Sequence, residues 1–527
     1  MNSRKFHMPI FSRHKNDTYH SGNNRRSPNP VSQLLKRWTF SRRPTNRPSQ
    51  GARNNMANLD SLPDELLLDI INHLPSGFSA LNLTCRRFHH LTTPYLYSTY
   101  SFCDVDASPF LRTIAATEGL ASYVKTINWN NSHEDIQRAH KSLGVNITAY
   151  HELLQILGRL NKPYAKALVR ELTYARSEDD DKVLNAILGL ATNVETLYVA
   201  ETSRWNHHTY WIPVFLSHTP QPFAHLRSAK LGGPLRIENV AALLVLPSMR
   251  TLELSQVLDL PRKLAQSFQW DDGDGFLSFE ALLQRHRSNV EHFHIEKSHI
   301  ELESLIPALG AFKRLKSFTY EHQESCLPSS RQHVPGWGHL FSQLSLHSDT
   351  LTSLRLSYSA EILFYNDPLL PEDKLWEFVP FIRGFPHLQT LSVTRSPLQE
   401  ATNRTPLSEI LPANLKTLIL LPGFSDAEDY CDQWDTHLVS ADLFLYDIIH
   451  QVTAGKLSCL RTIETRDWHP WYGHYPPSVE AIKTTFANIG ITFSSIPAEE
   501  GKQKELITTC DDIEPGWDLV DIDWHYS

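Results

Sequence analysis

The sequence predicts an α/β fold in which three short N-terminal helices precede a solenoid of parallel strands with helices on its outer side. Two observations lead to this prediction. A short phrase, apolar-x-x-apolar-x-apolar, occurs eleven times along the chain, and most gaps between its copies have a helical apolar pattern. Strand-like hexamers that alternate with helices at spacings of roughly 23 to 45 residues are typical of stacked repeats.

The stretch from Leu59 to Phe102 has the pattern of three short helices. Ser61 is suited to cap the first helix, and Pro75 is suited to end it. Apolar residues recur in this helix at helical spacing: Leu62, Leu66, Leu67, Ile70, Ile71 and Leu74. A second helix is expected at about 79–83 and a third at about 86–91, anchored by Leu81, Leu83, Phe88, Leu91, Tyr95 and Leu96. So small a unit buries little surface, so part of its apolar face is expected to meet a partner.

The order of these residues resembles the F-box. The resemblance rests on Leu62-Pro63-x-Glu65-Leu66, on the step from Ile70 to Leu74-Pro75, and on Cys85-Arg86-Arg87-Phe88. It implies an F-box at residues 58–102 that binds a Skp-type adaptor and, through it, a cullin. The adaptor-binding residues that it implies are Leu62, Pro63, Leu66, Ile70, Leu74 and Phe88. The alternative is a helix hairpin that only caps the next domain.

Composition narrows the class of protein. The mean hydropathy is -0.34, and no run of 18 apolar residues is present, so no transmembrane helix is expected. The six cysteines lie far apart without a C-x-x-C pair, which argues against a zinc ribbon and a disulfide scaffold. A reducing compartment, cytosol or nucleus, fits best.

Residues 1–57 form a basic segment that we expect to be disordered, because Asn, Ser, Pro and Arg dominate it. Residues 1–58 carry twelve Lys or Arg against one acid, Asp17, which leaves the remainder of the chain at -19. The chain as a whole is therefore not a basic nucleic-acid binder. Four interpretations of this segment stay open: a nuclear-import signal, contact with anionic surfaces, a mitochondrial presequence, and a solvated tail without a function. Translation could also begin at Met56.

A helical pattern at Ser108 to Ser122 follows, and the run Glu118 to Val124 resembles the segment after the F-box in many fungal F-box proteins. The apolar phrase then starts at Val124, Val169, Val194, Leu226, Met249, Val290, Leu315, Leu351, Leu388, Leu415 and Leu460. Helices are expected at Lys182–Leu190, Val240–Leu246, Leu277–His286, Leu302–Leu309, Leu375–Ile382 and Leu443–Val452. A unit of this kind cannot bury its apolar face alone, so neighbouring units must stack.

The phrase resembles the Leu-x-x-Leu-x-Leu core of leucine-rich repeats over roughly residues 124–500, and the solenoid is expected to span residues 103–500. The chain departs from that family in two ways: no Asn recurs three residues after the last apolar position, and the spacing is uneven. We therefore expect an irregular solenoid. Its fourth and sixth positions should face inward, while the third and fifth face the other way.

The outward positions are the candidate recognition surface. The third position is Ser or Thr in nine copies of the phrase: Thr126, Thr196, Ser228, Thr251, Ser317, Ser353, Thr390, Thr417 and Thr462. Stacked strands would align these hydroxyls, although a simple fit to a pleated surface also explains them. The fifth position varies widely. We expect a target protein to contact Tyr198, Lys230, Glu253, His292, His294 and Arg355.

Three insertions are expected as irregular loops, at Trp205–Phe223, Cys326–Trp337 and Asp426–Val439. The last of these is acidic. Residues 501–527 mix acids with Trp and Tyr, and they either cap the last repeat or form a free interaction tail.

No cofactor, metal or bond-making chemistry is expected. The segment Trp270 to Ala281 resembles an EF-hand loop, but its outer positions hold Trp270 and Ala281 where calcium needs carboxylates. His292 and His294 share one side of a strand with His299 close by, yet no acid or Cys clearly converges on them. No nucleophile-elbow, P-loop or dinucleotide-binding motif is present.

These observations favour the substrate-recognition subunit of a Skp–cullin–F-box ubiquitin ligase, itself without catalytic residues. Its F-box would bind the adaptor, and its repeats would bind a target protein of unknown identity. The alternative is a leucine-rich-repeat scaffold that binds proteins outside any ligase. A third possibility, an enzyme or calcium-regulated protein, would need a bound metal.

Overall fold

The computed structural model describes residues 62–74, 78–102, 108–117, 119–131, 155, 179–201, 223–233, 235–258, 283, 286–298, 300, 302–324, 337–360, 379–394, 398, 401–402, 405–421, 434–466 and 479–496. Two compact units are distinguished, Met1–Leu67 and Leu68–Ser527, and the boundary falls within the first described helix. The predicted basic N-terminal segment, the C-terminal tail, the EF-hand-like segment and His299 lie outside the described residues.

Helix α2 (Asp64–Asn72) begins where the sequence predicts a helix start. Asp64 and Glu65 occupy its first turn, where carboxylates interact favourably with the positive end of the helix dipole. Leu67 and Ile71 are fully buried, whereas Leu66 and Ile70 are exposed. Apolar residues therefore lie on both the buried side and the exposed side of this helix.

Helices α3 (Phe78–Asn82) and α4 (Arg86–Ser98) confirm the second and third predicted helices. A buried amide joins them. Asn82 Nδ2 donates to the hydroxyl of Thr92 at 3.1 Å, and Asn82 Oδ1 lies 2.7 Å from His89 Nδ1. Phe78 and Tyr95 add a stacked ring contact. Because these polar groups satisfy one another, the two helices hold together with few apolar residues.

Helix α4 is longer than predicted and leads directly into the first strand, β1 (Thr99–Phe102). It continues through Pro94, where a backbone hydrogen bond is lost. The hydroxyls of Thr92 and Thr93 bond to the carbonyls of Phe88 and His89 just before it. The predicted anchors Leu83 and Leu96 are exposed, so the structure corrects the expectation that they are packing residues.

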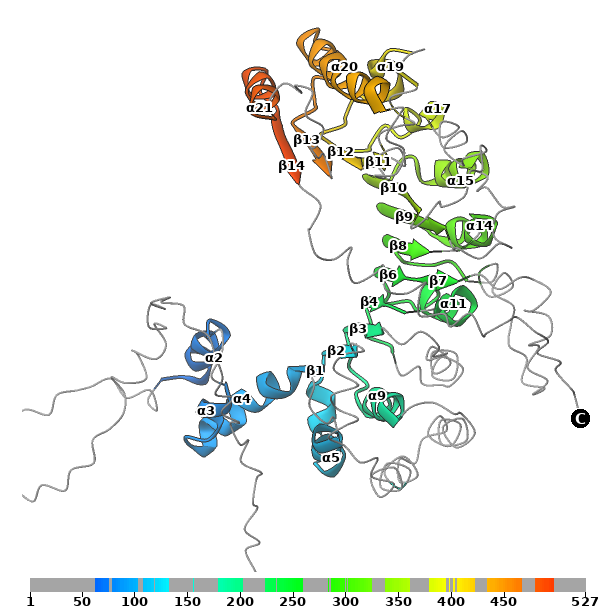
Figure 1. Ribbon diagram of the computed structural model, residues 1–527. Helices are drawn as coiled ribbons and strands as arrows, with labels where there is room; N and C mark the ends of the chain where they lie inside the picture. The colour runs from blue at the N-terminus through cyan, green and yellow to red at the C-terminus, as the bar shows by residue number, and fades with distance from the viewer. Residues whose placement is uncertain are drawn as a thin grey trace, which may run out of the picture. The chain divides into compact units, whose positions relative to one another are not determined.

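The twelve strands of the main sheet are all parallel and follow one another along the sheet in chain order (Figure 1). They are β1, β2 (Thr126–Asn131), β3 (Thr196–Glu201), β4 (Ser228–Leu231), β6 (Thr251–Ser255), β8 (His292–Ser298), β9 (Ser317–Glu324), β10 (Ser353–Ala360), β11 (Thr390–Thr394), β12 (Thr417–Leu421), β13 (Thr462–Arg466) and β14 (Thr492–Ile496). Two short strands, β5 (Leu235–Arg236) and β7 (Val257–Leu258), pair separately. Ten of the predicted phrases are confirmed as strands, and the copy at Val169 lies outside the described residues.

The described helices of the repeats lie on one side of this sheet (Figure 1). They are α5 (Ser108–Ala116), η2 (Leu120–Tyr123), α9 (Asp179–Leu190), α11 (Ile237–Leu244), α14 (Leu302–Ala311), α15 (Trp337–Leu344), η5 (Ser345–His347), α17 (Val379–Ile382), α19 (Leu407–Ile410), α20 (Trp434–Thr453) and α21 (Val479–Asn488). Helices α15, α19 and α21 were not predicted. The loop expected at Asp426–Val439 is wrong from Trp434 onward, where α20 begins.

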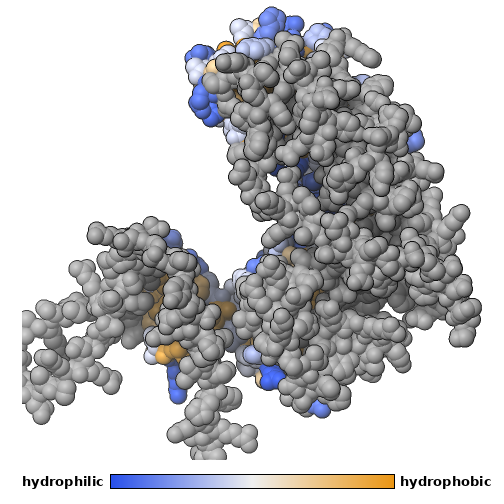
Figure 2. All heavy atoms as spheres, viewed as in Figure 1, coloured by the Kyte–Doolittle hydropathy of each residue, from blue (hydrophilic) through white to orange (hydrophobic). Residues whose placement is uncertain are grey.

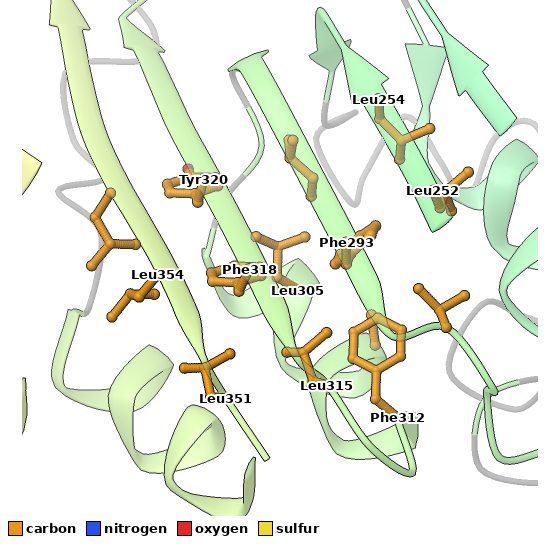
Figure 3. Packing of buried hydrophobic residues seen from close by; sticks show 14 of the residues in the cluster. Leu252, Leu254, Phe293, Leu305, Phe312, Leu315, Phe318, Tyr320, Leu351 and Leu354 are labelled. Atoms are coloured by element: carbon orange, nitrogen blue, oxygen red, sulfur yellow. The ribbon is translucent and has the colours of Figure 1, made fainter. Parts of the chain in front are cut away.

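The inward positions of the phrase form the core. Leu252, Phe293, Phe318 and Leu354 occupy the fourth position of successive strands and pair in register. Leu305 of α14 lies beneath them (Figure 3). All are essentially inaccessible to solvent. The prediction that the fourth and sixth positions face inward is therefore confirmed, and this continuous core joins the repeats.

A repeated hydrogen-bond pattern fixes the strand register. In the described phrases that start from Val124 to Leu415, the carbonyl at the second position accepts the amides of the second and third positions in the next described phrase. Lys316 O, for example, accepts the amides of Thr352 at 2.8 Å and Ser353 at 3.1 Å. The same pair recurs at Gln389 O with Lys416 and Thr417. A one-residue slip would break both bonds and turn the core residues outward.

Among the described repeats, an asparagine side chain joins neighbouring repeats at three places. Asn193, Asn289 and Asn414 each precede the first apolar residue of a phrase. Their Nδ2 atoms donate to the carbonyls of Ser122, Pro247 and Pro386, respectively, at 2.8–2.9 Å. The recurring Asn of regular leucine-rich repeats would follow the phrase, whereas these asparagines precede it.

A buried histidine also links two repeats. His347 in η5 donates from Nε2 to Leu309 O of α14 at 2.9 Å, and its ring lies 6.4 Å from that of Phe312. Burial lowers the pKa of His347, and the backbone hydrogen bond offsets only part of that effect. The imidazole therefore contributes its packing in the neutral form.

Replacing Asn289 or Asn414 by Ala should lower the free energy of unfolding by about 1 kcal/mol each, because a carbonyl between repeats loses its donor. Urea denaturation followed by circular dichroism measures the change. Asn488→Ala, at the exposed end of α21, is the matched control and should stay within about 0.5 kcal/mol of the wild type. If Asn289→Ala, Asn414→Ala and Asn488→Ala changed the free energy of unfolding equally, the result would contradict a stabilising contact between repeats through Asn289 and Asn414.

Stability should fall as the pH drops below about 6.5, because the unfolded chain then binds a proton that buried His347 resists binding. The dependence should be shallower in His347→Gln than in the wild type. Thermal midpoints measured between pH 7.5 and about 5.5 test this. An unchanged slope in His347→Gln would contradict the assignment.

Candidate functional site

Helix α2 presents an apolar pair on its exposed side. Leu66 and Ile70 stand one turn apart and are 51% and 43% exposed. Pro63, also exposed, immediately precedes the helix. Hydrophobic residues are visible at the surface of the N-terminal helices in Figure 2. Exposed large apolar side chains at helical spacing are suited to a groove on another protein.

The other predicted adaptor-binding residues are less accessible. Leu62 and Leu74 are half-buried. Phe88 of α4 is only 8% exposed, so in this structure its side chain contributes to packing. Leu83, which follows α3, is in contrast the most exposed large apolar residue among those described, although the sequence analysis did not assign it to a binding surface.

The side of the sheet away from the core is lined by columns of polar side chains. The third positions pair in register from Thr126 through Thr196, Ser228 and Thr251, and the column resumes from Ser317 to Thr462. Thr99 and Thr492 extend it at both ends. The predicted alignment of hydroxyls is therefore present. His292 stands in this column between Thr251 and Ser317.

The fifth positions form a second column, and it brings together most of the predicted target-binding residues. Tyr198, Lys230, Glu253 and His294 are consecutive neighbours across β3, β4, β6 and β8. Arg355 follows after Thr319. His292 belongs to the adjacent column, two residues away from His294. These side chains are therefore arranged as one continuous strip.

Charges in this strip are paired. Lys230 Nζ lies 3.0 Å from Glu253 Oε2, and this hydrogen bond raises the pKa of Lys230. Burial lowers the pKa of His294, and its Nε2 lies 3.4 Å from the hydroxyl of Ser317. Burial also raises the pKa of Glu321, which the nearby Arg355 partly offsets.

Residues two places beyond the fifth position also lie on the polar face, and they were not predicted as site residues. Strands β9 and β10 extend past the hexamer, so Glu321 and Ser357 lie opposite each other on the same polar face. Thr394 of β11 and Leu421 of β12 lie opposite each other in the same way. The sequence signal for these residues is an alternation of apolar and polar residues that continues past the phrase, as in Leu354-Arg355-Leu356-Ser357.

The polar face changes character at β12. Ile419 and Leu421 alternate with the core residues Leu418 and Leu420, so they belong to the polar side. Leu421 is buried but does not belong to the main core cluster. The face therefore has an apolar border beside the hydroxyls of β11.

Within the described part of the chain, no group of three or more His, Cys, Asp or Glu side chains could hold a metal ion. His292 and His294 remain neighbours on one strand, without a third ligand there. The described helices include none that is long and apolar enough to cross a membrane.

Comparison with known proteins identifies the N-terminal helices. Residues 59–103 match the F-box-like family model, and this segment includes α2, α3 and α4. The crystal structure of an internalin from Listeria monocytogenes aligns over 80% of this chain and 93% of its own, with 12% sequence identity and a TM-score of 0.28. At that score the likeness supports no conclusion. No curated protein matches the chain. The segment containing Leu66 and Ile70 is thus F-box-like.

Proposed function

We propose that this chain is the substrate-recognition subunit of a Skp–cullin–F-box ubiquitin ligase. The observation that supports this most directly is the exposed pair Leu66 and Ile70 on α2, inside the F-box-like segment. F-box-like segments generally bind Skp-type adaptors, and the pair provides the apolar contact that such binding needs. The polar face of the sheet, with its varied columns, provides a second surface for a target protein.

The mechanism would be proximity. The adaptor, and the cullin bound to it, would attach to the N-terminal helices, while the sheet holds a target protein within reach of ubiquitin transfer. The reaction itself would take place on other subunits. This chain would contribute binding and orientation, and a cytosolic or nuclear location would suit that role.

The energetics of the α2 pair indicate a strong contact. Burying a Leu or Ile side chain contributes about 1.5–3 kcal/mol. Because Leu66 and Ile70 are 51% and 43% exposed in the free chain, about half of that contribution remains available for binding. Aspartate at both positions would remove it and would also place two charges in an apolar contact.

Leu66→Asp combined with Ile70→Asp should therefore weaken binding to the Skp-type adaptor by at least about 100-fold, without unfolding the repeats. Co-purification and biolayer interferometry with the full-length chain measure binding, and circular dichroism checks the fold. Leu346→Asp with Tyr446→Asp is the matched control, since both residues are exposed and belong to the repeats.

Undiminished adaptor binding by the α2 double variant would contradict the proposed docking surface. If the wild type itself does not bind the adaptor, the chain would be a repeat scaffold that binds proteins outside a ligase. Loss of binding in both double variants would point to general unfolding and would deny α2 a specific role.

A further inference from the structure

Four polar atoms on β10 and β11 are buried and have no hydrogen-bond partner within the part of the chain that the structure describes. They are the hydroxyls of Ser357, Ser392 and Thr394 and the Nε of Arg355. The three hydroxyl residues are 8%, 3% and 4% exposed, respectively. Buried polar groups are nearly always paired, since an unpaired one costs about 1–3 kcal/mol. Their concentration on two strands therefore calls for a ligand.

Strand register places these four residues in a compact square. Arg355 of β10 is the direct partner of Ser392 on β11. Ser357 and Thr394 each stand two residues further along their strands, on the same face. Neighbouring strands lie about 4.8 Å apart, and two residues span about 6.6 Å. Side chains at this spacing can all reach one small group with several oxygen atoms.

Two further unpaired atoms do not belong to this square. Gln451 Oε1 is on α20, and Thr465 Oγ1 is on the core-facing side of β13. The cluster on β10 and β11 is distinguished by its position on the polar face. There it lies in the same strip as the predicted target-binding residues.

The neighbours of the square set the chemistry of its ligand. On one side, Glu321 Oε2 lies 3.6 Å from Arg355 Nη2, an ion pair that is too long for a hydrogen bond. Arg355 therefore keeps donors available. On the other side, Ile419 and Leu421 are the register partners of Ser392 and Thr394. The square thus has hydrogen-bond donors in the middle and an apolar border along β12.

The charge balance favours a singly charged acceptor. Arg355 is partly compensated by Glu321, so a dianion such as a phosphate monoester would meet little net positive charge and a nearby carboxylate. A cationic side chain would face Arg355 and would leave the guanidinium Nε unpaired. A carboxylate can accept from the guanidinium and the hydroxyls together.

We propose that Arg355, Ser357, Ser392 and Thr394 bind the carboxylate of an Asp or Glu side chain in the target protein, with an adjacent apolar residue against Ile419 and Leu421. This site deepens the target-binding half of the proposed function. The partly exposed Arg355 side chain marks the side from which the carboxylate approaches. Charge-assisted bonds from the guanidinium provide most of the affinity.

Panning a phage-displayed library of random peptides against the immobilised full-length chain tests the site. Selected peptides, synthesised with blocked ends, are then measured by fluorescence anisotropy. We expect an Asp or Glu beside an apolar residue in the selected peptides. Arg355→Met should weaken their binding by about 10-fold or more. Glu321→Gln should keep or tighten it, because a like charge is removed.

A double-mutant cycle locates the contact. Changing the acidic residue of the peptide to Asn or Gln should weaken binding to the wild type but not further weaken binding to Arg355→Met. Ser392→Ala and Thr394→Val should also weaken binding. Neither should lower the thermal midpoint, because each removes a buried unpaired hydroxyl. If Ser392 and Thr394 had only a structural role, their variants would not weaken peptide binding while keeping the thermal midpoint.

Three results would overturn the proposal: no peptide is selected, acidic peptides bind Arg355→Met as tightly as the wild type, or Lys- and Arg-containing peptides lose affinity in Glu321→Gln. The variant with Leu66→Asp and Ile70→Asp should select the same peptides as the wild type. Failure of adaptor binding and failure of this site are therefore distinguishable.

Discussion

The structure of the repeats depends on one hydrogen-bond arrangement, in which a single carbonyl accepts two amides from the next repeat. Ser98 O already accepts the amide of Lys125 at the start of the sheet, and Lys125 O accepts the amides of Glu195 and Thr196. This contact defines where each strand begins relative to its neighbour. Because the register is fixed at that point, equivalent positions of all repeats fall into straight columns.

The inward and outward columns of the sheet have different roles. In the described phrases the first, fourth and sixth positions are apolar, except for Thr465 in β13, because each inward side chain packs against its counterparts in neighbouring repeats. The outward columns have no such restriction, so Lys230, Glu253 and His294 can follow one another. The unpaired hydroxyls of Ser392 and Thr394 lower the free energy of unfolding. A cost of that kind is typical of residues retained for binding.

Much of the fold follows from the sequence because apolar periodicity reports burial directly. Two strands, β14 and β1, were not predicted from this periodicity. Before β14 the apolar residue is shifted by one, so Gly490 stands at the first position and Ile491 at the second. Strand β1 does fit the phrase, as Tyr97-Ser98-Thr99-Tyr100-Ser101-Phe102, but it directly continues α4 and was attributed to the helical segment.

The candidate sites were only partly predictable. The pattern of α2 gave Leu66 and Ile70 as apolar positions, but both faces of the helix are apolar. Only packing shows that Leu67 and Ile71 are buried and that Phe88 is too. In the sheet, Arg355 was predicted from its column. Ser357 and Thr394 were not, because the lengths of β10 and β11 depend on their neighbours rather than on local sequence.

Hydrogen–deuterium exchange of the full-length chain, alone and with its Skp-type adaptor, separates the two proposed surfaces. The adaptor should slow amide exchange in α2, around Leu66 and Ile70, and should leave exchange in strands β8 to β12 unchanged. Protection confined to those strands, with α2 exchanging as in the free chain, would contradict the assignment of the two surfaces.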